Sequence, residues 1–481
     1  MKLKLFISIF LILIIVTSYS QNVIVKGKSE EYANQTLRLM KYSDMITFTQ
    51  EEIASTKVDK DGNFEFNFLL KETTFCFINL DILKGFIVIE PSAEYTISLP
   101  KKTTKTSEEE LNPYYKPQEF YFTIDTTDKG ELNYNLRKFD SLYNSALLQI
   151  FKTSYAKYKK SKVDSLVFTI DSLFLDIDNQ YFNNYKEYRY ASIRKSAYLR
   201  DKEIAIKKYF IDKEILYNNP AYMDLFSDIF DKIFSTSSYL ADWDIIRLSI
   251  AKESFNGIDK ALSTKDLFSD KDFRHLVIIK GLFDLYYSNS ADKENILAVL
   301  DSMQSFAGKE NKVIINNFWK SATSLLENYK VPVFELPDKD NNLVNLNDFE
   351  GSFVYLSFFH PDSYVCKKQV EALEKLYSYN ADLLKIVTIF VADSPQKMND
   401  FITENKCNWT FLYYNKDIQL LKDYNILVYP TYLLINPEGK LVKNSASSPE
   451  EEFEREYNSY YLDWKKEQVK KTKEGKTLGN D

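Results

Sequence analysis

One short stretch, FFHPDSYVCKK at residues 358–368, holds the side chains best suited to chemistry. Cys366 follows Ser363 with two residues between them, and His360 precedes both. Near the start of a helix, unpaired N–H groups and the helix dipole stabilise a thiolate, which is the form that attacks disulfides. A serine forms no disulfide, and its hydroxyl is not ionised near neutral pH without a base. The stretch therefore indicates thiol chemistry with a single sulfur, and His360 is the nearby candidate base.

The other cysteines and histidines complete no evident metal or disulfide site. The chain has three cysteines and two histidines: Cys76, Cys366, Cys407, His275 and His360. This set is too sparse for a disulfide framework or a structural zinc site. His360, Asp362 and Cys366 are also residue types that bind metals, but polar residues of a surface loop are the simpler interpretation. We expect Cys76 to be a small buried hydrophobe, no Cys366–Cys407 bond, and neither metal nor cofactor.

Strands and helices alternate around Cys366. GSFVYLSFF at 351–359 is a nearly continuous apolar run, as expected of a central strand buried on both faces. Helical spacing follows over residues 363–379, and LLKIVTIFVAD at 383–393 predicts a second buried strand. YPTYLLINPEGKLV at 429–442 predicts a strand, a turn and a returning strand. These segments predict an α/β domain over residues 331–470, followed by a disordered tail at 471–481.

The first part of the chain has the pattern of β structure. VDKDGNFEFNFLL places Asp61-Gly62 as a hairpin turn before Phe64, Phe66 and Phe68, which share one face of a strand. Further strand-like segments follow, so residues 21–100 predict an antiparallel, β-sandwich-like domain. Residues 101–128 contain prolines between polar residues and predict an extended linker.

A long segment without helix breakers comes next. Pro220 is the one proline between Pro117 and Pro332, and no glycine occurs from 131 to 256. Apolar residues recur at helical spacing in this span, so residues 129–330 predict an all-α domain. Its aromatic residues are the expected core of such a domain, although they could also line a groove for a partner.

The N-terminus has the pattern of a secretory signal peptide over residues 1–20. Lys2 and Lys4 precede an apolar run from Leu5 to Val16, and Ser18 and Ser20 are the small residues of a cleavage site. No cysteine lies nearby, so we expect no lipoprotein anchor. The run is too short to span a bilayer, and no later segment is apolar enough to do so. The sequence predicts an exported, periplasmic protein with no membrane span in the mature chain.

Composition excludes general nucleic-acid binding. Charged residues make up 27% of the 481 residues, and the net charge is −7. Nucleic-acid binding needs a basic face that displaces counterions. The apolar fraction of 44% supplies enough material for more than one core, and the length alone predicts about three domains.

Residues 331 to about 465 resemble the thioredoxin fold in its exported branch, the TlpA-like and alkyl hydroperoxide reductase/thiol-specific antioxidant (redoxin) proteins. The segments FELPDKDNNLVNLNDFEG, VYLSFF, the Cys366 helix and YPTYLLINPEGK carry the resemblance, in the same order and spacing. It implies a C-terminal thioredoxin-like domain and, nominally, thiol–disulfide oxidoreductase activity in cell redox homeostasis. The preceding β and helical regions resemble the N-terminal half of some exported TlpA-like proteins.

In this family a C-x-x-C motif lies where the first strand meets the first helix. The first cysteine attacks the substrate disulfide, and the second resolves the mixed disulfide. The aligned positions here are Ser363-Tyr364-Val365-Cys366, so Ser363 replaces the attacking cysteine and the motif is degenerate. Tyr429-Pro430 matches the family's loop facing the active site, where the bond before proline is cis and a substrate strand can pair.

Two functions follow as alternatives. In the first, the protein lacks dithiol turnover and acts as a scaffold or as a module that binds a periplasmic protein or peptide. In the second, Cys366 serves a one-cysteine reductase or peroxidase with an external resolving thiol. Peroxiredoxins share the Ser363-x-x-Cys366 ending, but Phe359 replaces their proline, and the nearest candidate for their arginine is Arg455 in the last helix. We favour the first alternative.

Overall fold

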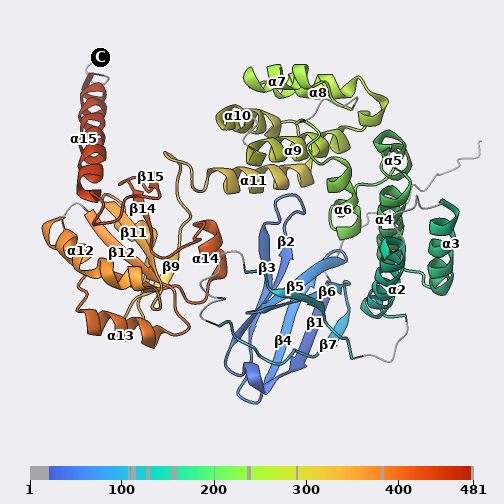
Figure 1. Cartoon of the computed structure of the whole chain (residues 1–481), viewed down its shortest axis with the longest axis horizontal. Coiled ribbons are helices and arrows are strands. Elements are labelled where there is room, and N and C mark those ends of the chain that lie inside the picture. Colours follow the sequence, from blue (N-terminus) through green and yellow to red (C-terminus); the bar gives the residue numbers. More distant parts are fainter. Residues whose placement is uncertain are drawn as a thin grey trace, which may run out of the picture. The chain divides into compact units, whose positions relative to one another are not determined.

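The computed structural model describes residues 21–106, 109, 115–125, 130–152, 160–199, 201–235, 240–288, 291–380 and 384–477 (Figure 1). The predicted signal peptide lies outside these residues. The chain divides into two compact units. The N-terminal unit comprises Met1–Thr103 and Pro117–Ile314, and the C-terminal unit comprises Thr104–Lys116 and Ile315–Asp481.

Two sheets form the β part of the N-terminal unit, with strand orders β4-β1-β7 and β3-β2-β5-β6-β8. The strands are β1 (Gln21–Lys28), β2 (Thr36–Tyr42), β3 (Gln50–Lys57), β4 (Asn63–Leu70), β5 (Thr74–Leu80), β6 (Leu83–Ile89), β7 (Glu94–Ile97) and β8 (Gln118–Tyr121). Most neighbours are antiparallel, whereas β7 and β8 pair parallel to β1 and β6. Alternate residues of β4, including Phe64 and Phe66, share one apolar cluster with Leu39 and Ile87 of the other sheet. The predicted N-terminal β domain is confirmed.

Two local predictions in this region need correction. Gly62 takes the expected positive φ of +86°, but the turn links β3 to β4, which pair with different neighbours in different sheets. The turn therefore leads from one sheet into the other and closes no hairpin. The strand β8 lies within the stretch predicted as an extended linker, because its backbone pairs with β6.

Ten α-helices follow in the described residues: α2 (Leu132–Lys152), α3 (Lys160–Asp171), α4 (Gln180–Ala197), α5 (Lys202–Tyr209), α6 (Pro220–Ile229), α7 (Trp243–Ala251), α8 (Phe255–Ser263), α9 (Lys271–Ser288), α10 (Lys293–Gln304) and α11 (Lys309–Thr323). The predicted all-α region is confirmed. Its one proline, Pro220, begins α6, where the missing N–H costs no helical hydrogen bond. Asn219 caps the same helix by accepting from the Ala221 and Tyr222 amides.

The Asn133 side chain fastens α2 to the β6 strand. Its Oδ1 accepts a hydrogen bond from Val88 N at 2.7 Å, and its Nδ2 donates to Val88 O at 2.8 Å. Val88 lies past Phe86, where the pairing of β6 with β8 ends. The amide therefore takes the place of a neighbouring strand and holds the helices onto the sheet.

The C-terminal unit is built on a five-stranded sheet with the order β13-β12-β11-β14-β15. Its strands are β11 (Phe353–Phe359), β12 (Leu384–Phe390), β13 (Thr410–Tyr413), β14 (Thr431–Ile435) and β15 (Leu441–Asn444). The strands β11, β12 and β13 are parallel, and β14 and β15 run antiparallel to their neighbours. All of β11 is buried, as its apolar run predicts. A short hairpin of β9 (Glu335–Pro337) and β10 (Leu343–Asn345) precedes this sheet.

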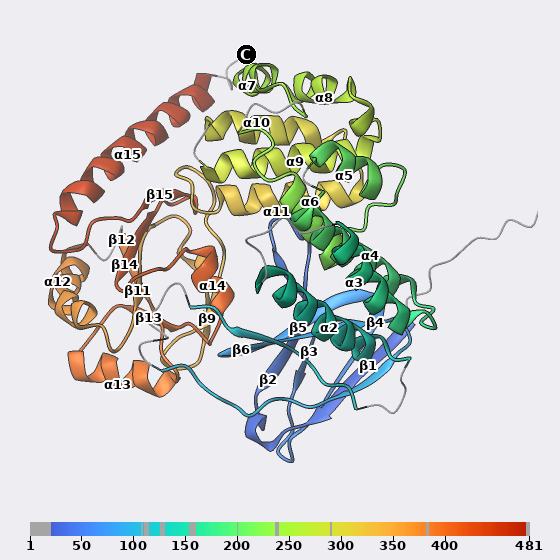
Figure 2. The same ribbon diagram turned by 45° about the vertical axis from the view of Figure 1, so that its right-hand side comes forward.

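Helices cover both faces of this sheet. The helices α12 (Tyr364–Asn380) and α13 (Pro395–Asn405) lie on one face, and α14 (Ile418–Asp423) lies on the other (Figure 1, Figure 2). The last helix, α15 (Phe453–Thr477), packs Phe453 and Tyr457 into the cluster under α12. Because α15 runs past residue 470, it corrects the predicted start of the tail; residues 478–481 lie outside the described residues. Across the part of the chain that the structure describes, no helix combines the length and apolar character needed to cross a bilayer.

Candidate functional site

Ser363 is the N-cap of α12, at the point where β11 gives way to the helix. Its Oγ accepts a hydrogen bond from the Cys366 amide at 3.3 Å. The same hydroxyl donates to the Tyr429 carbonyl oxygen at 3.0 Å. Serine is among the preferred N-cap residues because its side chain satisfies an amide that the helix leaves unpaired. The hydroxyl at the motif position thus holds the helix start and ties it to the loop before Pro430.

The predicted site residues come together around this serine. The Tyr429–Pro430 bond is cis, as the resemblance implies, and both residues are half-buried. The Tyr429 ring lies 5.4 Å from the His360 ring, measured between centroids. His360 is buried, and its Nδ1 accepts a hydrogen bond from the Asp362 amide at 3.2 Å. This nitrogen of His360 therefore holds the turn between β11 and α12.

Cys366 faces the interior of the domain. It is 0% exposed, and it belongs to the same apolar stripe of α12 as Val370 and Leu373. Burial raises the pKa of its thiol above the ordinary value, and the hydrogen bond with Ser363 and contacts with nearby backbone offset this rise in part. A thiol that stays protonated is a slow nucleophile. The position and environment of Cys366 are those of a packed core cysteine.

The other two cysteines lie away from the motif, and all three are free thiols. Cys76 is fully buried in β5, as expected. Cys407 follows α13, and burial raises the pKa of its thiol to about 12, with a smaller contribution from the nearby Glu374 carboxylate. Cys366 and Cys407 are not bonded to each other in the structure. Within the described ranges, no group of three or more His, Cys, Asp or Glu side chains is placed to hold a metal ion.

Exposed apolar side chains flank the Ser363–Tyr429 hydrogen bond. Tyr364 is 69% exposed and Val365 50% on the helix side, while Leu427 is 39% and Val428 65% exposed on the loop side. We call these four residues the apolar rim. The rim was not predicted from the sequence. The helical spacing could have predicted the exposure of Tyr364 and Val365. These two residues occupy the first two helical positions after the cap, whereas Cys366 at the third position begins the buried stripe.

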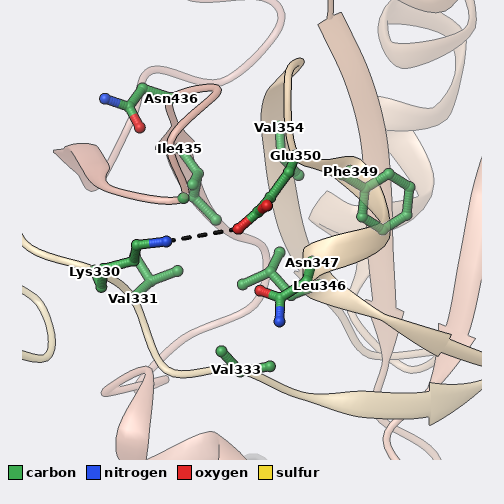
Figure 3. Close-up of a pocket in the computed structure, with 11 residues that line it drawn as sticks. Lys330, Val331, Val333, Leu346, Asn347, Phe349, Glu350, Val354, Ile435 and Asn436 are labelled. Carbon is green, nitrogen blue, oxygen red and sulfur yellow. Dashed lines mark ion pairs between the residues drawn. The ribbon is translucent and has the colours of Figure 1, made fainter.

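A small hollow lies at the opposite end of β11 (Figure 3). Its volume is about 20 Å³, and its lining includes Val354 and Ile435, which pair across β11 and β14. Lys330 Nζ and Glu350 Oε1 face each other across it at 3.6 Å (Figure 3). A space of this size holds about one water molecule, so it is no substrate site.

The C-terminal unit is a thioredoxin-like α/β domain whose motif position holds a serine and a buried cysteine. A model of the AhpC/TSA family matches residues 328–444, all within this unit. Thiol-disulfide oxidoreductase ResA of Bacillus subtilis (strain 168) is 30% identical over 131 residues, which are 27% of this chain and 73% of that protein. The chain belongs to the AhpC/TSA, or redoxin, family of thioredoxin-like thiol–disulfide oxidoreductases.

Two further similarities fall in the same range. Peroxiredoxin Bcp of Escherichia coli (strain K12) is 32% identical over 101 residues, which are 20% of this chain and 61% of that protein. The crystal structure of the thioredoxin domain of a thiol-disulfide oxidoreductase from Bacteroides vulgatus has 27% sequence identity and a TM-score of 0.24. That similarity covers 25% of this chain and 89% of that domain.

Proposed function

We propose that this protein is an exported, periplasmic member of the redoxin family that has no dithiol turnover and binds a protein or peptide beside the Pro430 loop. The observation that carries the proposal is that the Ser363 hydroxyl makes two hydrogen bonds. It accepts one from the Cys366 amide and donates one to the Tyr429 carbonyl oxygen. The group at the attacking position of the family is a structural cap. Protein recovered from the periplasmic fraction should start at Gln21, which N-terminal sequencing tests.

The chemistry of the motif supports the absence of turnover. A thiol–disulfide relay needs an exposed thiolate that attacks and a second sulfur that releases the product. Ser363 cannot form the mixed disulfide. Cys366 is buried and its thiol pKa is raised, so it is poorly placed to attack in its stead. The alternative of a one-cysteine reductase or peroxidase requires Cys366 to reach solvent as a thiolate, and its burial disfavours this.

The apolar rim supports the binding role. Four exposed apolar side chains are brought to one place because the Ser363–Tyr429 hydrogen bond joins the segments that carry them. Burying a side chain of this kind against a partner contributes about 1.5 to 3 kcal/mol. Pro430 lies next to the rim and is half-exposed, so an extended peptide can lie along the loop with its apolar side chains against the rim.

Substitutions in the rim test the binding role. Peptides selected from a random displayed library on the mature protein should carry apolar residues, and a fluorescent copy of one gives a Kd by anisotropy. We expect Tyr364→Ser and Val428→Ser each to weaken binding about tenfold or more. Leu343→Ser is the matched control, because Leu343 is a 65% exposed residue of β10 outside the rim. Equal Kd values for the rim variants and this control would refute binding at the rim.

A further inference from the structure

A polar cavity of about 420 Å³ lies in the N-terminal unit, which is outside the residues matched by the redoxin family. Residues from four elements line it: Tyr121 of β8, Arg137 and Asp140 of α2, Tyr185 and Arg189 of α4, and Asp224 of α6. Arg137 and Asp140 are three residues apart on one helix, and Tyr185 and Arg189 are four apart on the other, so each pair shares a helix face. Small-molecule sites typically have volumes of about 300 to 1,000 Å³.

Part of the cavity wall is fixed by interactions among its own side chains. The Tyr185 hydroxyl lies 3.0 Å from both carboxylate oxygens of Asp140. The Arg189 guanidinium lies over the Tyr143 ring at 4.3 Å from its centroid, and its Nε is 3.8 Å from Asp140 Oδ1. That separation is an ion pair but too long for a hydrogen bond. The arginine is therefore held in position while its donors stay unused.

Donors and an acceptor remain available in this cavity. Arg189 Nε and Arg137 Nε are buried and have no hydrogen-bond partner among the described residues. Arg137 uses Nη1 to donate to Thr123 Oγ1 at 2.9 Å, which anchors its side chain. Asp224 is an exposed residue whose carboxylate forms no hydrogen bond or salt bridge with the other described residues, and Arg189 is its charged neighbour. Because buried guanidinium nitrogens are normally hydrogen-bonded, the two unpartnered Nε atoms indicate a missing acceptor beside the arginines, and the exposed Asp224 carboxylate can take a cationic group of the same ligand.

The charges decide which ligand fits. Two guanidinium groups and two carboxylates balance, and one of each already forms the Arg189–Asp140 pair. An anion such as phosphate would meet the two carboxylates, and a simple cation would meet the two arginines. We propose that the cavity binds a short peptide with free termini, whose carboxylate accepts hydrogen bonds from Arg137 and Arg189 and whose ammonium group pairs with Asp224. Guanidinium groups suit carboxylates because they present several donors in one plane. This site is independent of the apolar rim.

Calorimetric titration of the mature protein tests the site with trialanine, N-acetyl-trialanine, trialanine amide, trehalose and inorganic phosphate as probes. We expect trialanine to bind and each blocked peptide to bind at least tenfold more weakly. Asp224→Asn keeps the shape of the side chain and should weaken trialanine binding by a similar factor. Asp228→Asn is the matched control, since Asp228 lies one turn later on α6 and pairs with Lys195.

Several results would overturn the proposal. These are no heat with trialanine at millimolar concentration, equal binding of the free and blocked peptides, and an Asp224→Asn variant that binds like Asp228→Asn. Tighter binding of trehalose or phosphate than of trialanine would assign the cavity to another class of ligand. Loss of binding in Val428→Ser with retention in Asp224→Asn would place the peptide on the apolar rim instead.

Discussion

The Ser363 hydroxyl donates a hydrogen bond to the Tyr429 carbonyl oxygen at 3.0 Å, which ties the start of α12 to the loop that carries Pro430. In the proposed alignment this serine takes the place of the family's attacking cysteine, and here its side chain is part of the framework of the site. The same hydroxyl also accepts a hydrogen bond from the Cys366 amide. A single side chain therefore connects the start of the motif helix, the residue that carries the buried thiol, and the loop. Ser363 thus has two effects: its hydroxyl holds the site together, and its presence leaves Cys366 as the one sulfur of the motif.

Removing this hydroxyl should destabilise the domain. Ser363→Ala loses the helix cap and the bond to Tyr429, and we expect the free energy of unfolding to fall by about 1 to 2 kcal/mol. Urea unfolding of the mature protein measures the change. Ser459→Ala, at an exposed position of α15, is the control and should stay within about 0.5 kcal/mol of wild type. A Ser363→Ala variant as stable as the control would show that the cap contributes nothing.

Stability should fall at alkaline pH because of the buried thiols. Burial raises the folded-state pKa of the Cys407 thiol to about 12, whereas an unfolded cysteine has a pKa of about 8.5. The protonated thiol is fully compatible with the fold below the unfolded pKa, and its contribution is lost as the pH rises toward the folded pKa. At pH 10 we expect the loss to reach about 2 kcal/mol for this thiol.

The Cys407→Ala variant isolates that effect. Urea unfolding of wild type and variant is measured between pH 8 and pH 10. The difference between the two proteins removes the contributions of the other titrating groups, and the free energy of unfolding of the variant should decline less steeply with pH. Parallel declines in the two proteins would mean that the Cys407 thiol titrates normally in the folded state.

The Asn133 side-chain amide should contribute substantially to the stability of the N-terminal unit. Asn133→Ala leaves the Val88 N–H and C=O without their partner, and each unsatisfied buried group costs about 1 to 3 kcal/mol. We expect the free energy of unfolding to fall by about 2 to 4 kcal/mol in urea titrations. Asn183→Ala, at an exposed position of α4, should change it by less than about 0.5 kcal/mol. Similar values for both variants would argue against a fastening role.

The buried strands and the helical region were the parts of the fold that the sequence predicted best. The continuous apolar run at 353–359 predicts a strand buried on both faces, and β11 is buried throughout. The span without glycine at 131–256 predicts helices, because breakers are absent over many turns. Both signals are local, so the sequence carries them directly. The destination of the Gly62 turn was not predictable in this way, since a turn residue fixes backbone angles and not the sheet that the next strand joins.

The candidate site shows the same division. Motif spacing identified Ser363, Cys366 and Pro430, and the structure places them at one end of β11. The second bond of the Ser363 hydroxyl depends on a residue far along the chain, which no local pattern indicates. The polar cavity could not be predicted from the sequence either, because Arg189 and Asp224 come together there through the packing of α4 on α6.

Insulin reduction with glutathione as electron donor is the most direct test of a site without dithiol turnover. Wild type should match the rate without protein, and Ser363→Cys should create turnover. Ser363→Cys with Cys366→Ala should be slower than Ser363→Cys, because glutathione must then resolve its mixed disulfide. Silence of Ser363→Cys would mean that the motif alignment is wrong. A wild-type rate comparable to that of Ser363→Cys, and lost in Cys366→Ala, would contradict the account.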